Sequence, residues 1–284
     1  MVLSQMKAIK SAILEFSCSY PKEEMKMKKV MLSFAVIGLA LGGSAAANAG
    51  AVESVPHWTY DGASGPAHWG EISAGFHLCE AGKAGSPIDV RSTRKAPADA
   101  PRIQFSYQPM PVNLLNSGHA VQFMAMPGKS SVKLGNTQYQ LVQFHFHSPG
   151  EERFAGRASP MDMHLVHADA DGTLLVVAVQ FVVGDKPNPV LDALIDDIPE
   201  HSGEEKEDDS LLINPIGMLP STTSGYYTYS GSLTTPPCSE GVTWVEMKVP
   251  VTISRTQLEK LRAFYYHNQR PVQALNGRDI IEVD

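Results

Sequence analysis

Three histidines lie in two short segments in which apolar and polar residues alternate. The first segment, QFHFHSPGEE from Gln143 to Glu152, carries His145 and His147, and the second, MDMHLVHA, carries His164. Because alternate side chains of a β-strand share a face, His145 and His147 point the same way if their segment is extended. If the two strands pair, all three imidazoles converge. Three neutral nitrogens with a fourth position open are the ligand set of a catalytic zinc site.

The same strand faces carry hydrogen-bonding partners for these imidazoles. Gln143 and Asp162 each stand two residues before a proposed ligand and on its face. Metal-bound imidazoles usually donate their second N–H to a carboxylate or an amide, which fixes the tautomer. An isolated His-x-His pair is more often an ordinary hydrogen-bonded pair at a sheet end, so the third histidine and the two partners make the prediction specific.

A second kind of metal site fits some of the same residues. His145, His147 and Glu151 match the HxHxxxE half of a cupin motif, in which the glutamate itself binds manganese, iron or another metal. That motif requires a further glycine-and-histidine segment downstream, and we find none. A cupin-type metal enzyme therefore stays as an alternative.

The elements that must position these residues are mainly strands. Alternating patterns between turn residues predict strands within 112–126, 131–147, 161–168 and 173–184, the last buried on both faces. Helices are predicted at 188–198 and 254–266, where Ser254 and Gln257 have capping-box spacing. The acidic run 200–209 is predicted to be a solvated surface loop. The fold class that follows is mainly β (α+β): a single domain with a large central, mostly antiparallel, twisted mixed sheet and short peripheral helices.

Composition agrees with one exported domain. The 284 residues are 43% hydrophobic and 19% charged, with a formal charge of −7 and no basic stripe, which argues against a nucleic-acid or anionic-membrane partner. Residues 25–49 combine three lysines, a short apolar run and the sequence Ala47-Asn48-Ala49, the pattern of a cleaved secretory signal. The apolar run is too short to span a membrane, and no cysteine follows it to carry a lipid anchor.

We therefore divide the chain into an N-terminal extension with a signal peptide, 1–49, and a catalytic domain, 50–284. The awkward extension before the signal suggests that translation starts at Met25 or Met27. The mature protein is expected in the periplasm if the cell has an outer membrane, and outside the cell otherwise. Cleavage after Ala49 leaves two cysteines, Cys79 and Cys238, which predict one disulfide in an oxidising compartment. Two free buried thiols are the alternative.

Four motifs together resemble a known family. NSGHAVQF, QFHFHSPGEE, MDMHLVH and GSLTTPPCSEGVTW, in this order, are similar to those of α-class carbonic anhydrases of the exported bacterial type. The resemblance runs from His57–Trp69 to Asn268–Arg278, nearly the whole mature chain. It implies reversible hydration of carbon dioxide to bicarbonate and a proton through a zinc-bound hydroxide, with ester hydrolysis as a side activity. It also implies inhibition by sulfonamides and anions, and a monomer or homodimer.

The resemblance assigns one zinc ion per chain to three ligands: His145, His147 and His164. It implies that Gln143 supports His145, that Asn268 accepts from His147 and that Asp162 holds His164. The family often has glutamate at the position of Asp162, so the shorter arm puts the length of that hydrogen bond in question.

Around the metal, the resemblance makes Thr234 the residue that orients the hydroxide and donates its own proton to Glu151. Thr235 would position bicarbonate. An apolar wall would hold carbon dioxide, which has no charge and no donor; its members are Val166, Val176, Leu233, Val242 and Trp244.

The resemblance also makes His119, in NSGHA, the proton carrier, a role that suits imidazole because it titrates near neutral pH. Three polar residues would order the water chain that leads to it: Tyr60, Asn116 and Gln122. The Cys79–Cys238 bond would brace the loop that carries Thr234.

Two positions depart from the family. Gly85-Ser86-Pro87 stands where Gln-Ser-Pro is usual, and Glu152 replaces a histidine often found after the catalytic glutamate. A non-catalytic binding protein on the same scaffold is the remaining alternative, and the presence of all three histidines, Glu151 and Thr234 argues against it.

Overall fold

The computed structural model describes residues 56–221 and 225–284. The predicted signal peptide, the translation start and the boundary at 49/50 lie outside the described residues. Within those ranges, no helix is both long and apolar enough to cross a membrane.

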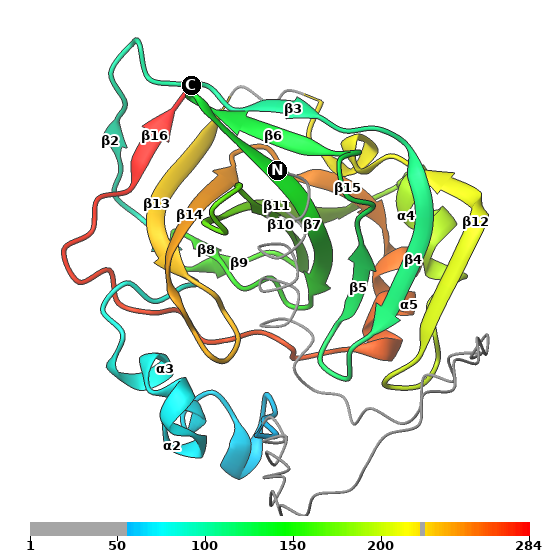
Figure 1. Ribbon diagram of the computed structural model, residues 1–284, viewed down its shortest axis with the longest axis horizontal. Helices are drawn as coiled ribbons and strands as arrows, with labels where there is room; N and C mark the ends of the chain where they lie inside the picture. The colour runs from blue at the N-terminus through cyan, green and yellow to red at the C-terminus, as the bar shows by residue number, and fades with distance from the viewer. Residues whose placement is uncertain (1–55, 222–224) are drawn as a thin grey trace, which may run out of the picture.

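A 13-stranded sheet forms most of the molecule (Figure 1). Its main path runs β12-β4-β5-β7-β10-β11-β14-β13-β16-β2. In chain order these strands are β2 (Arg94–Lys95), β4 (Met110–Asn116), β5 (Val121–Met124), β7 (Thr137–His147), β10 (Met161–Ala168), β11 (Leu174–Gly184), β12 (Glu205–Ile213), β13 (Tyr226–Ser232), β14 (Glu240–Met247) and β16 (Ile281–Val283). Three strands pair off this path: β3 (Gln104–Ser106), β6 (Ser131–Leu134) and β15 (Val251–Ser254).

The sheet is mixed but mostly antiparallel, as the alternating sequence pattern predicts. The parallel pairs are β11 with β14, β11 with β15, and β16 with β2, and the other strand pairs of this sheet are antiparallel. A separate three-stranded sheet consists of β1 (Asp89–Val90), β8 (Arg153–Phe154) and β9 (Arg157–Ala158).

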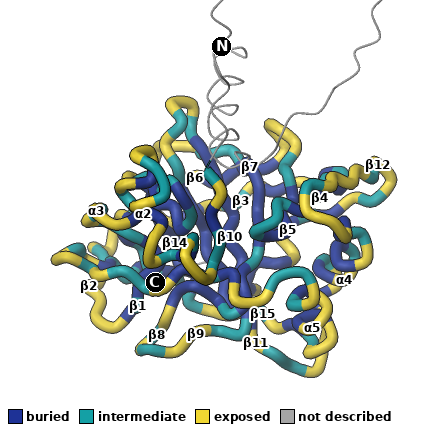
Figure 2. The backbone as a smooth tube through the Cα atoms, turned by 90° about the horizontal axis from the view of Figure 1, so that it is seen from below, coloured by how far each residue is buried: buried dark blue, intermediate teal, exposed yellow. Residues whose placement is uncertain are grey.

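The centre of the sheet is buried on both faces. Every residue of β10 is buried, and so is the run from Leu175 to Phe181 in β11. Met163, Leu165 and Phe144 join the main apolar core on one face, while the other face carries a second, smaller apolar cluster. Figure 2 shows the buried backbone through the middle of the molecule and exposed backbone towards its outer strands and loops. Burial on both faces is consistent with the nearly continuous apolar sequence of β11.

The helices are short. They are α2 (Trp69–Ile72), α3 (Leu78–Ala81), α4 (Pro189–Ile195) and α5 (Arg255–Phe264), with 3-10 turns at Gly62–Ser64, Ala74–Phe76 and Pro215–Met218. The two predicted helices are α4 and α5. In α5 the capping box is complete, because the Ser254 hydroxyl accepts from the Gln257 N–H and the Gln257 side chain accepts from the Ser254 N–H.

The prediction of a surface loop at 200–209 is wrong for its second half. Residues from Glu205 onward form β12, which pairs antiparallel with β4 at one edge of the sheet. Its residues are almost all exposed or half-exposed. Charged side chains suit such a position, because they keep an edge strand from pairing with another chain.

The predicted disulfide is present. Cys79 in α3 is bonded to Cys238, 159 positions later in the chain. The Cys238 N–H donates to the carbonyl of Thr235, so the bond is attached directly to the loop that carries Thr234.

Candidate metal centre

Strand register brings the three histidines together. His164 of β10 is paired directly with His145 of β7, and Asp162 with His147. One nitrogen from each of the three rings can be chosen so that all three atoms lie within 4.8 Å of one another. The three side chains are buried, with exposed fractions of 7%, 1% and 1% for residues 145, 147 and 164.

Each imidazole has an oxygen partner for its other ring nitrogen. His145 Nδ1 lies 2.8 Å from Gln143 Oε1, and His147 Nδ1 lies 3.1 Å from Asp162 Oδ1. His164 Nε2 lies 3.2 and 3.3 Å from the two oxygens of Glu152. If these outer nitrogens carry the protons, Nε2 of His145, Nε2 of His147 and Nδ1 of His164 are left with free lone pairs.

Two of the expected partnerships differ in the structure. Asp162 bonds His147 and lies 3.6 Å from His164 Nε2, beyond hydrogen-bond distance. Its short arm and its register place it opposite His147. Asn268 does not accept from His147: its oxygen accepts from the Ser148 N–H, and its amide donates to the carbonyls of Phe146 and His119.

Burial favours neutral imidazoles at the first two positions. The pKa values of His145 and His147 are held well below the usual range, first by burial and then by the neighbouring imidazoles. Burial also lowers the pKa of His164, but Glu152 and Asp162 outweigh it and the net direction is upward. His145 and His147 are therefore uncharged at pH 7, and uncharged imidazoles with a hydrogen-bonded outer nitrogen fit a zinc ion.

Glu151 lies beside the ligands. Its Oε2 is 3.8 Å from His147 Nε2 and 3.9 Å from His164 Nδ1, while its Oε1 accepts the Arg270 N–H at 2.7 Å. Burial raises the pKa of Glu151, and so do Asp162 and Glu152; the Arg270 N–H and the Thr234 side chain act in the opposite direction. Thr234 is itself buried, and Thr235 beside it is half-buried. Glu151 therefore faces both Thr234 and the ligand nitrogens.

The five predicted residues of the apolar wall belong to one cluster, the smaller of the two that flank the sheet. Val166 is paired with Val176, and Val176 with Trp244, across β10, β11 and β14. Leu233 and Val242 complete the set. The Trp244 ring centroid lies 4.9 Å from that of His164, which puts the cluster directly against the histidine trio.

Comparison with known proteins agrees with this site. A family model described as eukaryotic-type carbonic anhydrase matches residues 64–283. The chain belongs to this family.

Among its relatives, a carbonic anhydrase from Pectobacterium carotovorum is 41% identical over 246 residues, 86% of this chain and 98% of the relative. One from Nostoc sp. is 37% identical and covers 89% of this chain and 95% of its own length. The solved α-carbonic anhydrase from Thermovibrio ammonificans, in complex with the inhibitor sulfanilamide, has a TM-score of 0.75 at 41% identity and covers 80% of this chain and 99% of its own.

Membership of the carbonic anhydrase family removes the cupin alternative. The geometry agrees, because the described groups close enough to share an ion are the histidine trio and a second set, Glu151, Glu152 and His164. The cupin triad of His145, His147 and Glu151 is not among them. In the second set one oxygen of each carboxylate accepts a hydrogen bond: Glu151 Oε1 from the Arg270 backbone N–H and Glu152 Oε2 from Gln180 Nε2.

His119, which the carbonic anhydrase resemblance makes the proton carrier, is stacked on Trp58 with ring centroids 3.7 Å apart and planes inclined by 10°. Burial, together with the nearby His57, lowers its pKa to about 4. In this position the imidazole is uncharged at neutral pH. A group that must take up a proton near pH 7 is better matched when its pKa lies closer to 7.

Trp58→Ala should raise the pKa of His119 from about 4 towards its ordinary value near 6.5, because it removes the ring that covers the imidazole. An NMR titration of the ring signals measures this directly. The wild-type fold should lose stability as the pH falls from about 6.5 towards 4, where the unfolded chain takes up this proton and the folded one does not. A pKa that stays near 4 in the variant would show that Trp58 is not the cause.

The other predicted proton-path residues lie in different settings. Gln122 of β5 is paired directly with His145, so it lies on the ligand face of the sheet. The pKa of Tyr60 is raised by burial and then by the charges of Glu151 and Asp162, which places this phenol near the carboxylates. Asn116 is buried and donates to the Pro199 carbonyl, so this part of the side chain holds the fold.

Two residues of the site were not assigned a role from the sequence. From the sequence, Glu152 is only a departure from the family, because its contact with His164 depends on how the turn after β7 folds. The sequence gives no role to Arg270. This residue is buried, its guanidinium donates to the carbonyls of Ser86 and Cys79, and its backbone N–H donates to Glu151. A lone arginine in a loop gives no sequence signal for this, although buried arginines are rare.

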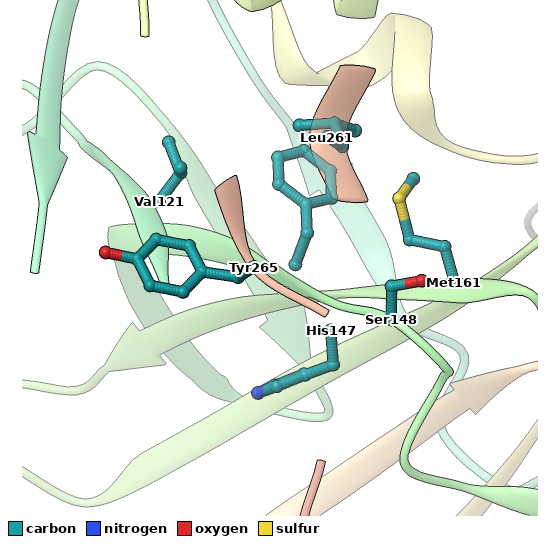
Figure 3. Close-up of a pocket in the computed structure, with 7 residues that line it drawn as sticks. Val121, His147, Ser148, Met161, Leu261 and Tyr265 are labelled. Atoms are coloured by element: carbon teal, nitrogen blue, oxygen red, sulfur yellow. The ribbon is translucent and has the colours of Figure 1, made fainter. Parts of the chain in front are cut away.

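A small pocket lies where the end of α5 packs on the sheet (Figure 3). Its lining is mostly apolar and comprises Val121, Phe146, His147, Ser148, Met161, Leu261 and Tyr265. His147 is the one member of the histidine trio that contacts it. We attribute the pocket to helix packing behind β7.

Proposed function

We propose that this chain is a zinc enzyme that catalyses the reversible hydration of carbon dioxide to bicarbonate and a proton. The observation that carries the proposal is the convergence of three buried imidazoles, each with its outer nitrogen hydrogen-bonded, against an apolar cluster. Zinc held by His145, His147 and His164 would lower the pKa of a water molecule to about 7, a value established for carbonic anhydrases in general.

The residues around the trio suit this substrate. Carbon dioxide is uncharged and has no donor, so the face formed by Val166, Val176 and Trp244 can hold it without leaving a polar group unpaired. Product bicarbonate is more polar and is better solvated by water than by this wall, which favours its release. Thr235, which is half-buried beside Thr234, is proposed to position bicarbonate.

Thr234 and Glu151 are proposed to select the orientation of the reacting oxygen. With its proton directed at Glu151, the Thr234 hydroxyl has only lone pairs to offer to the site. It therefore accepts a hydrogen bond from an oxygen that bears a proton and disfavours anions that bear none. The Arg270 N–H keeps Glu151 in the position that this arrangement needs.

His119 is proposed to carry the proton to solvent. His119→Ala should lower the turnover number at low buffer concentration about 100-fold, the lower end of the usual range for a general acid–base group. Small imidazole buffers should restore most of it, since they can enter and take the proton themselves. Stopped-flow assays across a buffer series measure both effects. A loss of turnover that imidazole does not relieve would assign His119 a structural role instead.

Stopped-flow carbon dioxide hydration by the mature chain, with and without a chelator, tests the function. We expect hydration that disappears with zinc removal and returns when zinc is added back. A zinc-loaded, folded chain without hydration activity would instead support the non-catalytic alternative.

The setting of the enzyme is also part of the proposal. The Cys79–Cys238 bond supports an exported, periplasmic protein, because disulfides persist in oxidising compartments. Primary sulfonamides are expected to inhibit, as the relative from Thermovibrio ammonificans has been solved with sulfanilamide. Hydrolysis of activated esters is expected as a side activity. The protein is expected to be a monomer or a homodimer.

A further inference from the structure

The carboxylate nearest to the outer nitrogen of His164 is that of Glu152, not that of Asp162. His164 Nε2 lies 3.2 and 3.3 Å from the two Glu152 oxygens, and 3.6 Å from Asp162 Oδ2. All three side chains are almost completely buried. In such surroundings an N–H needs an acceptor, since water cannot replace it.

Both oxygens of Asp162 are already in use. Oδ1 accepts from His147 Nδ1 at 3.1 Å, and Oδ2 accepts from the Glu151 N–H at 2.6 Å. Asp162 therefore connects His147 to the turn after β7, and the N–H of His164 needs another acceptor.

We propose that Glu152 is the residue that positions His164 for metal binding, while Asp162 positions His147. Two of the three ligand imidazoles are then held by separate carboxylates, and the third is held by the amide of Gln143. This inference rests on the proposed zinc site. It gives Glu152 a role in retaining the metal, and Glu152 is a positioning residue because it acts through His164.

The fold holds Glu152 at this place from both sides. Gln180 Nε2 donates to Glu152 Oε2 at 3.4 Å, and Gln180 is paired with Asp162 across β10 and β11. On the other side, the N–H of the next residue, Arg153, donates to the Ile88 carbonyl at 3.1 Å, beside the pairing of β1 with β8. The small three-stranded sheet thus fixes the backbone from which Glu152 reaches His164.

Glu246 provides a matched control. Its carboxyl is also fully buried and interacts electrostatically with Glu152, but neither of its oxygens has a hydrogen-bond partner among the described residues. Removing Glu246 deletes a buried carboxyl from the same region without removing an acceptor from any of the three histidines.

The test compares Glu152→Met and Glu246→Met in the mature, zinc-loaded protein. Zinc release into excess chromogenic chelator should be about 10- to 100-fold faster for Glu152→Met, the usual effect of losing a hydrogen bond to a ligand histidine. Release from Glu246→Met should stay within about threefold of wild type, because its ligand contacts are intact. Glu152→Gln should be intermediate, since its amide oxygen can still accept from His164.

A spectroscopic measurement separates positioning from general destabilisation. In NMR spectra of the zinc-loaded protein, the ring N–H signal of His164 should shift or exchange with water in Glu152→Met, while those of His145 and His147 remain. The inference is overturned if Glu152→Met releases zinc at the wild-type rate, if Glu246→Met releases it equally fast, or if the His164 signal is unchanged. Carbon dioxide hydration by the wild type is measured in parallel. If the wild type is inactive but its zinc retention depends on Glu152, the proposed function is refuted and this inference stands. If the wild type is active but its zinc retention does not depend on Glu152, this inference is refuted and the proposed function stands.

Discussion

His164→Ala should remove nearly all bound zinc and nearly all carbon dioxide hydration. The variant keeps two imidazoles, and the buried Glu152 carboxylate loses its imidazole partner but keeps the Gln180 amide. Without the metal, water keeps its ordinary pKa of 15.7 instead of about 7, so its ionised fraction at neutral pH falls by about eight orders of magnitude.

Metal analysis after gel filtration and stopped-flow hydration measure the two effects on the same sample. His201→Ala is a suitable control, because His201 is exposed. It should leave zinc content and rate unchanged. A His164→Ala protein with one zinc per chain and wild-type turnover would show that the site lies elsewhere.

Removal of the disulfide should have the largest effect on stability. Cys79 and Cys238 are 159 positions apart, and cross-linking a loop of that size stabilises the fold by roughly 5 kcal/mol in the chain-entropy model. The double variant Cys79→Ser with Cys238→Ser should lose most of this free energy of unfolding in urea titrations. At low temperature, where the double variant is still folded, its carbon dioxide hydration rate should stay close to that of wild type, since neither cysteine contacts the proposed ligands.

Chemical reduction of the wild type is the control for that experiment, because it breaks the same bond without changing the side-chain composition. Reduced wild type and the double variant should unfold at similar urea concentrations. A loss below about 1 kcal/mol would mean that the unfolded chain is already constrained, or that the bond strains the native loop.

The core of the sheet and the convergence of the three histidines could be predicted because both follow a period of two. His145 and His147 share a face in any extended backbone, and the apolar pattern of 161–168 selects the register that pairs His164 with His145. A shift by one residue would turn His164 to the opposite face. The start of α5 could also be predicted, since its capping box is formed by two residues only three positions apart in the sequence.

The partners of the histidines could not be predicted from strand faces alone. Asp162 and His164 share a face of β10, yet Asp162 bonds across to His147, and the acceptor for His164 comes from a turn residue, Glu152. Which acceptor each imidazole contacts depends on side-chain length and on the path of the turn, and the alternation of polar and apolar residues predicts neither. The same holds for Arg270, whose contacts join segments 119 to 191 positions apart in the chain.

The edge strand β12 was missed for another reason. Its acidic sequence has little apolar alternation because it lies at the sheet edge and most of its side chains face solvent. Backbone pairing with β4 alone defines it, and charge-rich composition by itself points to a loop.

The most direct test of the central claim is a crystal structure of the mature protein with zinc, with anomalous data collected at the zinc edge. We predict a single strong anomalous peak from a zinc ion that is bound by His145 Nε2, His147 Nε2 and His164 Nδ1, with each zinc–nitrogen distance about 2.0–2.1 Å. A peak between Glu151, Glu152 and His164, or no peak at the three imidazoles in a chain that hydrates carbon dioxide, would contradict it.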